Sequence, residues 1–194
     1  MSLSLSSRRQ PHAPWPVQVA VPLGLALLVE AGLRLADTGT SVLGQRLCEA
    51  HGWLALGGLL TVLAARPLRL LPYRRALGLA AFGFALLHVA YVYGVVMHLD
   101  PLSLLFLGPD EQFGWILGLL AVLGLIPLAM TSTNAAMRRM GPRWKRLHRI
   151  TPALTVLANL HALWTGVHGG LSPISVGLTL ILTVLLLQRK KVRT

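Results

Sequence analysis

Residues 76 to 99 read ALGLAAFGFALLHVAYVYGVVMHL, and this run contains no Asp, Glu, Lys or Arg. A helix needs about 20 predominantly apolar residues to cross the hydrocarbon of a bilayer. Further apolar stretches lie at residues 17–35, 52–65, 113–130, 150–167 and 171–187. The sequence therefore predicts an all-α integral membrane protein, folded as a bundle of six transmembrane helices.

The composition agrees with this prediction. The 194 residues are 54% hydrophobic and 12% charged, and the mean hydropathy is +0.64. Soluble domains usually carry about 25% charged residues, so these values exclude a disordered chain and argue against a soluble domain. Six crossings use about 120 residues, which leaves short loops and no room for a second globular domain. Any nucleotide-binding domain that the function needs is therefore expected on another chain.

The basic residues alternate between the ends of the six stretches. The 18 Lys and Arg against 6 Asp and Glu give a formal net charge of +12. Most of them share one side: Arg8, Arg9, Arg66, Arg69, Arg74, Arg75, Arg138, Arg139, Arg143, Lys145, Arg146, Arg149, Arg189, Lys190, Lys191 and Arg193. Arg34, Arg46 and all the acids fall on the other side. The positive-inside rule then predicts that both termini are cytoplasmic, and it explains the basic clusters without nucleic acid.

Two histidines are expected at one depth in the membrane. His88 follows Arg75 at the same spacing at which His161 follows His148, and Arg75 and His148 each mark a basic boundary of an outward-running helix. That spacing puts both rings about 20 Å from the inner edge. Buried imidazoles need partners, and two at one level suit the axial positions of a six-coordinate b-type haem. The alternative is that each ring makes its own interhelical hydrogen bond, whereas zinc lacks further ligands at this depth.

His148 is a separate candidate. It lies about 20 Å nearer the cytoplasm than His161, a separation that fits a second haem stacked across the membrane. The position of matching depth on the neighbouring predicted helix is Arg75, which cannot be an axial ligand. His148 is therefore a second-haem ligand with another partner, a contact of a propionate or quinone, or an interfacial residue of a basic helix.

The remaining polar residues of the predicted spans lie near their outer ends. Glu30 and Arg34 are four residues apart on one helical face, and they are either a functional pair or an ion pair that neutralises itself. We expect His51, His98 and His168 to form a solvated outer rim and assign none of them as a ligand.

Two segments carry a family resemblance: YRRALGLAAFGFALLHVAYVY at 73–93 and LAMTSTNAAMRRMGPRWKRLHRITPALTVLANLHALW at 128–164. With a weaker stretch they extend the match over about residues 50–164. The motifs RRxLGL, TSTxA and RxxGxxWxxLH occur together and are followed by His161. This combination resembles the MsrQ (YedZ) family, the haem-binding membrane subunits of the periplasmic methionine sulfoxide reductase system, within the ferric-reductase-like transmembrane proteins.

The resemblance implies a six-helix bundle that binds one haem b, or two, with His88, His148 and His161 at the family's haem-associated positions. It also implies a place in the bacterial inner (cytoplasmic) membrane, and electron transfer from quinol or reduced flavin to MsrP, a periplasmic molybdenum reductase. Arg74 and Arg75 match the family's paired arginines, which are expected to contact an FMN phosphate or a quinone head group, or to set topology.

The domain assignment follows from these predictions. Residues 1–16 are expected to form a cytoplasmic tail, residues 17–187 the haem-binding transmembrane domain, and residues 188–194 a basic cytoplasmic tail. The chain has no substrate-reducing residues of its own, so it is expected to act in an enzyme only as one subunit. Two alternatives are a haem-containing ferric or metal reductase-like subunit with another donor and acceptor, and a haem-free membrane assembly or transport protein.

Overall fold

A computed structural model describes residues 15–36, 42–169 and 172–191, and every regular element in these ranges is helical. The long α-helices are α1 (Trp15–Ala36), α2 (Leu43–Ala64), α3 (Arg74–Tyr91), α4 (Pro109–Met130), α7 (Thr151–Gly169) and α8 (Pro173–Lys191). The short elements are η1 (Leu71–Tyr73), η2 (Val92–Val96), η3 (Pro101–Phe106), α5 (Asn134–Met140) and α6 (Pro142–His148). The predicted all-α class is confirmed.

Three helical segments in the described ranges are long and apolar enough to cross a membrane. They are Leu43–Ala64, Leu71–Val96 and Pro109–Met130, and they correspond to the stretches expected at 52–65, 76–99 and 113–130. The other three expected stretches coincide with α1, α7 and α8. The chain therefore has the helices of a membrane protein, while the count of six crossings and the side of the termini stay predictions.

Residues 74–96 form one continuous helix that changes from an α-helix to a π-helix near its end. From α3 the chain passes directly into η2, a π-helix, and then turns at His98 and Leu99, whose φ angles are 50° and 66°. The Asp100 side chain accepts a hydrogen bond of 2.9 Å from the Leu102 backbone N–H and so caps η3. The helix ends here because residues with positive φ cannot continue a right-handed helix.

Small residues let the helices approach closely. A Cβ on Gly58 of α2 would lie 2.9 Å from the Cβ of Ala81 on α3, so these two helices pack almost backbone to backbone, as small residues allow in membrane proteins. The core that they share with α4 and α7 consists of Ala55, Leu59, Ala81, Phe84, Ala85, Leu125, Leu128 and Leu154. This core holds the middle of α3 and α7 in fixed positions.

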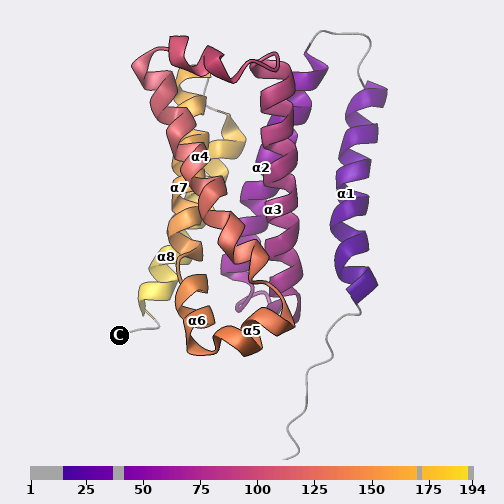
Figure 1. Ribbon diagram of the computed structural model, residues 1–194, viewed down its shortest axis with the longest axis vertical. Helices are drawn as coiled ribbons and strands as arrows, with labels where there is room; N and C mark the ends of the chain where they lie inside the picture. Colours follow the sequence, from indigo (N-terminus) through magenta and orange to yellow (C-terminus); the bar gives the residue numbers. More distant parts are fainter. Residues whose placement is uncertain (1–14, 37–41, 170–171, 192–194) are drawn as a thin grey trace, which may run out of the picture.

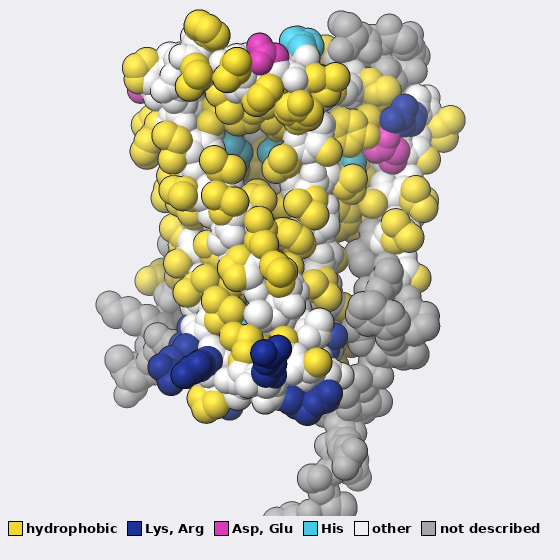
Figure 2. Space-filling model, viewed as in Figure 1, with side chains coloured by type: hydrophobic (Ala, Val, Ile, Leu, Met, Phe, Trp, Pro, Cys, Tyr) yellow, Lys and Arg dark blue, Asp and Glu magenta, His cyan; other side chains and the backbone are white. Residues whose placement is uncertain are grey.

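The elements are distributed unevenly around this core (Figure 1). Helices α2, α3, α4, α7 and α8 form the bundle, α1 stands at its side next to α2 and α3, and α5 and α6 run along one end. Lys and Arg side chains gather at the end that carries α5 and α6, and acidic side chains lie toward the opposite end (Figure 2). This separation agrees with the charge distribution from which the topology was predicted.

Candidate haem site

His88 on α3 and His161 on α7 face each other inside the bundle. Their ring centroids are 6.2 Å apart and the ring planes meet at 72°, so the two residues lie at the shared depth that the residue spacing predicted. An imidazole nitrogen binds a transition metal at about 2 Å, and the ring centre lies about 1.1 Å farther out, which gives about 6.3 Å between two rings on one metal ion. The observed spacing fits a bis-histidine metal centre.

Each ring is held by a backbone carbonyl of a third or fourth helix. The His88 Nδ1–H donates to the carbonyl of Cys48 on α2 at 2.9 Å, and the His161 Nδ1–H donates to the carbonyl of Gly114 on α4 at 2.8 Å. Within the described ranges no hydrogen bond involves the Nε2 atom of either ring. Since Nδ1 carries the proton, Nε2 carries the lone pair that a metal needs, and the carbonyl fixes the ring orientation.

Glycines make room for both rings. A Cβ on Gly52 of α2 would lie 3.0 Å from Nδ1 of His88, and a Cβ on Gly118 of α4 would lie 2.9 Å from Nδ1 and Cε1 of His161. These separations are below van der Waals contact, so any larger residue at either position would displace the ring. The site is therefore a pair of imidazoles, each seated against a glycine and tied to a carbonyl, which is a donor set that suits axial ligation of haem iron.

The wall of the site beyond His161 is aromatic. Trp164, one turn along α7, donates from Nε1 to the Asp110 carbonyl at 2.7 Å and meets Phe113 edge to face with ring centroids 4.7 Å apart. A Cβ on Gly114 would lie 3.0 Å from the indole of Trp164. The first turns of α4 thus pack against Trp164 on α7. Histidine side chains show between apolar ones in this half of the bundle (Figure 2).

His148 has other neighbours. Its Nε2 lies 3.1 Å from the Thr131 hydroxyl, and its ring stacks on Trp144 with centroids 4.1 Å apart. The Thr131 hydroxyl donates to the Pro127 carbonyl at 2.6 Å, so it accepts from His148 and the proton of this ring is on Nε2. Burial lowers the pKa of His148, and the positive charge of Arg74 lowers it further. Both effects disfavour protonation of the ring, and its role as a ligand stays a prediction.

The paired arginines lie at the basic end of α3. Arg75 donates from Nη1 to the Asn134 side-chain oxygen at 2.6 Å, and its buried Nε has no hydrogen-bond partner. A buried guanidinium nitrogen without an acceptor is costly, so this position favours an anionic group. Arg74 is exposed beside it. The structure thus brings Arg74 close to His148, apart from the pair formed by His88 and His161.

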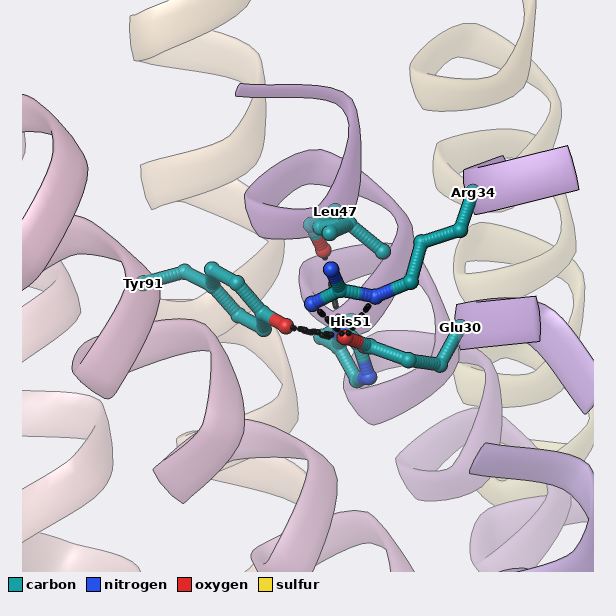
Figure 3. A network of polar contacts seen from close by, with 5 residues as sticks. All are labelled: Glu30, Arg34, Leu47, His51 and Tyr91. Atoms are coloured by element: carbon teal, nitrogen blue, oxygen red, sulfur yellow. Dashed lines mark hydrogen bonds and ion pairs between the residues drawn. The ribbon is translucent and has the colours of Figure 1, made fainter. Parts of the chain in front are cut away.

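The predictions for the polar residues near the outer ends of the helices were only partly right. Glu30 and Arg34 form an ion pair (Figure 3), with Nη2 to Oε1 at 2.6 Å, which is compatible with both of the roles that the sequence left open. The expectation of a solvated His51 is wrong, because its side chain is 1% exposed. The helix that was expected from residue 52 begins at Leu43 and carries His51 into the bundle. His98 is exposed as expected, and the side chain of His168 lies outside the part of the chain that can be described.

The fold and the site together define a helical membrane protein with a partly buried histidine pair suited to a redox metal centre. Residues 57–159 match the family described as ferric reductase like transmembrane component, and the chain belongs to this family. The matched range includes His88 and His148 and ends just before His161. Membership in this family supports a membrane electron-transfer role.

One curated relative matches about half of the chain. The magnetosome protein MamZ of Magnetospirillum gryphiswaldense is 45% identical over 100 residues, which are 50% of this chain and 15% of MamZ. The chain thus covers only a small part of the length of that relative. No solved structure matches the sequence.

Proposed function

We propose that this protein is the haem b electron-transfer subunit of a bacterial inner-membrane complex, which passes electrons from quinol or reduced flavin to a periplasmic molybdenum methionine sulfoxide reductase of the MsrP type. The observation that carries the proposal is the 6.2 Å separation of the His88 and His161 rings. A b-type haem held there by His88 and His161 would supply a one-electron redox centre.

The residues around the pair hold both imidazoles in a ligating state. The Cys48 and Gly114 carbonyls keep the proton of each ring on Nδ1, so each Nε2 keeps the lone pair that would bind a metal ion. Hydrogen bonds of this kind raise the basicity of the ligand and tune the potential. Apolar residues of the shared core exclude water from the middle of the bundle.

Electron entry is proposed at the basic end. Arg74, Arg75 and His148 lie there, and the unpartnered Nε of Arg75 would donate to a flavin phosphate or to a quinone oxygen. In the proposed topology six helices cross the membrane, residues 1–16 and 188–194 are cytoplasmic, and this end faces the cytoplasm. The MsrP-type acceptor rests on the resemblance of residues 73–93 and 128–164 to the MsrQ family.

Purified protein tests the haem. The expected product is red, with a Soret band and a sharp α band on reduction, and the pyridine haemochrome gives the haem-to-protein ratio. His88→Ala and His161→Ala should each lose the low-spin spectrum, while His98→Ala, which changes an exposed histidine, should keep it. A colourless, well-folded wild-type protein would contradict the proposal and favour an assembly or transport role. Full low-spin haem in either axial variant would remove that residue from the site.

A second function is favoured by the description of the family, ferric reductase like transmembrane component. In this alternative the same haem-binding subunit delivers electrons to ferric iron or another metal ion. Anaerobic mixing of the reduced protein with an MsrP-type reductase and methionine sulfoxide, or with ferric citrate, separates the two. Haem oxidation faster with the reductase supports the first function, and oxidation faster with ferric citrate supports the second.

A further inference from the structure

The segment that joins α3 to α4 presents apolar side chains to the outside. It contains η3 and runs across the end of the bundle opposite α5 and α6 (Figure 1). Leu102, Leu105 and Phe106 of η3 are 61%, 70% and 87% exposed, and apolar side chains gather over this end (Figure 2). Exposed apolar patches of this kind are typical of surfaces that another molecule covers.

The polar side chains of this segment hold it in place. The Ser103 hydroxyl donates to the Asp100 carbonyl at 2.7 Å, and the Gln112 side-chain amide on α4 donates to the Leu107 carbonyl at 3.0 Å. Both ends of η3 are therefore tied, the first by the turn at Asp100 and the second by α4. The outward apolar side chains thus belong to a preformed surface, and a preformed surface binds without a large cost of ordering.

Acidic residues flank these apolar side chains on both sides in the sequence. Asp100 precedes η3, and Asp110 and Glu111 follow it in the first turn of α4. All three are exposed, and the sequence from residue 76 to residue 137 contains no Lys or Arg. The surface therefore combines an apolar centre with negative charge.

The sign of this charge decides between the possible occupants. Segments that lie on a bilayer surface are usually rich in Lys and Arg on their polar face, because these cations are attracted to anionic lipids. A second copy of this chain in a symmetric contact would bring its own acids against these acids. The occupant that fits is a soluble protein whose contact surface has basic residues around an apolar centre.

The first turns of α4 also contact the residues beside the histidine pair. The Asp110 carbonyl accepts a hydrogen bond of 2.7 Å from Trp164, and the Phe113 ring packs edge to face on the same indole. One helical turn after Asp110, the Gly114 carbonyl holds the His161 ring at 2.8 Å. A protein bound over η3 and Asp110 therefore lies about one helical turn from the group that holds His161. This position favours a partner that exchanges electrons with the centre over one that only anchors the protein.

We propose that η3 and the first turn of α4 form the docking surface for the soluble protein that takes electrons from this subunit. The partner that fits has an apolar contact patch surrounded by Lys and Arg. The inference rests on the proposed function, in which this end faces the periplasm and the acceptor is an MsrP-type reductase. Each transfer oxidises the subunit and reduces the partner by one electron, and docking itself forms no covalent bond.

A binding assay tests this surface and does not need haem. The protein is reconstituted in phosphatidylcholine nanodiscs, and its dissociation constant for a purified MsrP-type reductase is measured by biolayer interferometry at low and high salt. Phe106→Ala should weaken binding about tenfold, as the truncation of an aromatic anchor does. Asp110→Asn combined with Glu111→Gln should weaken binding mainly at low salt, because salt screens the attraction between exposed charges. The matched controls, which should bind as the wild type does, are Leu119→Ala at an exposed apolar position of α4 and Arg143→Gln on α6.

A photocrosslinker identifies the molecule that covers the surface. p-Benzoylphenylalanine in place of Phe106, whose side chain is exposed, should crosslink to the reductase on illumination. Crosslinking to lipid or to a second copy of the chain would overturn the inference, and so would a wild-type protein that does not bind the reductase. Wild-type affinity in Phe106→Ala and in the doubly substituted acidic variant would overturn the inference while leaving the proposed function intact. A wild-type protein that binds the reductase through this surface but holds no haem would instead overturn the proposed function and support the docking surface.

Discussion

Replacing Gly118 by Ala is the sharpest test of the histidine pair. The new Cβ would lie 2.9 Å from Nδ1 and from Cε1 of His161, whereas carbon atoms at rest are about 3.5 Å apart or more. The ring must therefore move by about 0.6 Å to restore ordinary contact. It is tied to the Gly114 carbonyl at 2.8 Å, so the movement either breaks this bond or changes the spacing to His88. Metal-ligand distances hold within about 0.2 Å, so the displacement exceeds what axial ligation tolerates.

The expected result is a loss of low-spin haem from the Gly118→Ala protein. Disturbing the groups that orient a metal-bound histidine typically weakens binding about 10- to 100-fold. The assay is a haem titration of the protein in detergent, followed at the Soret and α bands. Gly52→Ala, whose Cβ would lie 3.0 Å from Nδ1 of His88, should act in the same direction.

Two other glycines separate this steric effect from a general effect of alanine. Gly57 on α2 and Gly83 on α3 have no atom within 4 Å of an added Cβ. Alanine there gains about 1 kcal/mol of helix propensity, as it does at Gly118, without touching the site. Gly57→Ala and Gly83→Ala should therefore bind haem as the wild type does. Wild-type haem affinity in Gly118→Ala would refute the placement of the His161 ring.

Three further predictions concern the rest of the fold. Burial lowers the pKa of His148, so the native state resists protonation of this ring. The contribution of His148 to the free energy of unfolding should therefore be complete above the unfolded pKa of about 6.5 and be lost as the pH falls below it. His148→Gln should flatten the pH dependence of the melting temperature between pH 7 and 5. Asn159→Leu removes the bond of 3.1 Å to Thr179 that joins α7 to α8 and should cost about 0.6 kcal/mol in detergent unfolding, a value near zero indicating that the bond adds nothing. Gly124→Ala brings a Cβ into the Leu154 side chain and should lower the melting temperature, whereas an unchanged melting temperature would mean that the Leu154 side chain moves aside at no cost.

The level of the histidine pair was predictable, because depth along a helix depends only on a constant rise per residue. The equal spacings from Arg75 to His88 and from His148 to His161 put the two histidines at one height, and the rings lie 6.2 Å apart. Such spacings cannot give the carbonyls that hold the rings. Cys48 and Gly114 contribute a backbone atom, which every residue has, so their side chains carry no signal for this role.

The start of α2 was harder to predict because polar residues conceal it. Gln45, Arg46 and Glu49 lower the hydropathy of the first turns, and the sequence placed the helix start near residue 52. In the structure α2 begins at Leu43, and the polar side chains lie on its exposed side while Leu47, Cys48 and His51 are buried. A hydropathy average combines the exposed and the buried face of the helix into one value. It therefore cannot show that His51 lies on the buried face.

The contacts of Glu30 show that residue spacing predicts contacts within one helix but not contacts between helices. The spacing of four residues between Glu30 and Arg34 predicts their ion pair, since residues four apart share a helical face. Nothing in the spacing of α1 indicates that the same carboxylate also accepts from Tyr91, which is 61 residues away. An ion pair that only neutralised itself would need no third partner from another helix. The Tyr91 bond therefore ties α1 to the helix that carries His88, a contact between helices that the spacing within α1 cannot reveal.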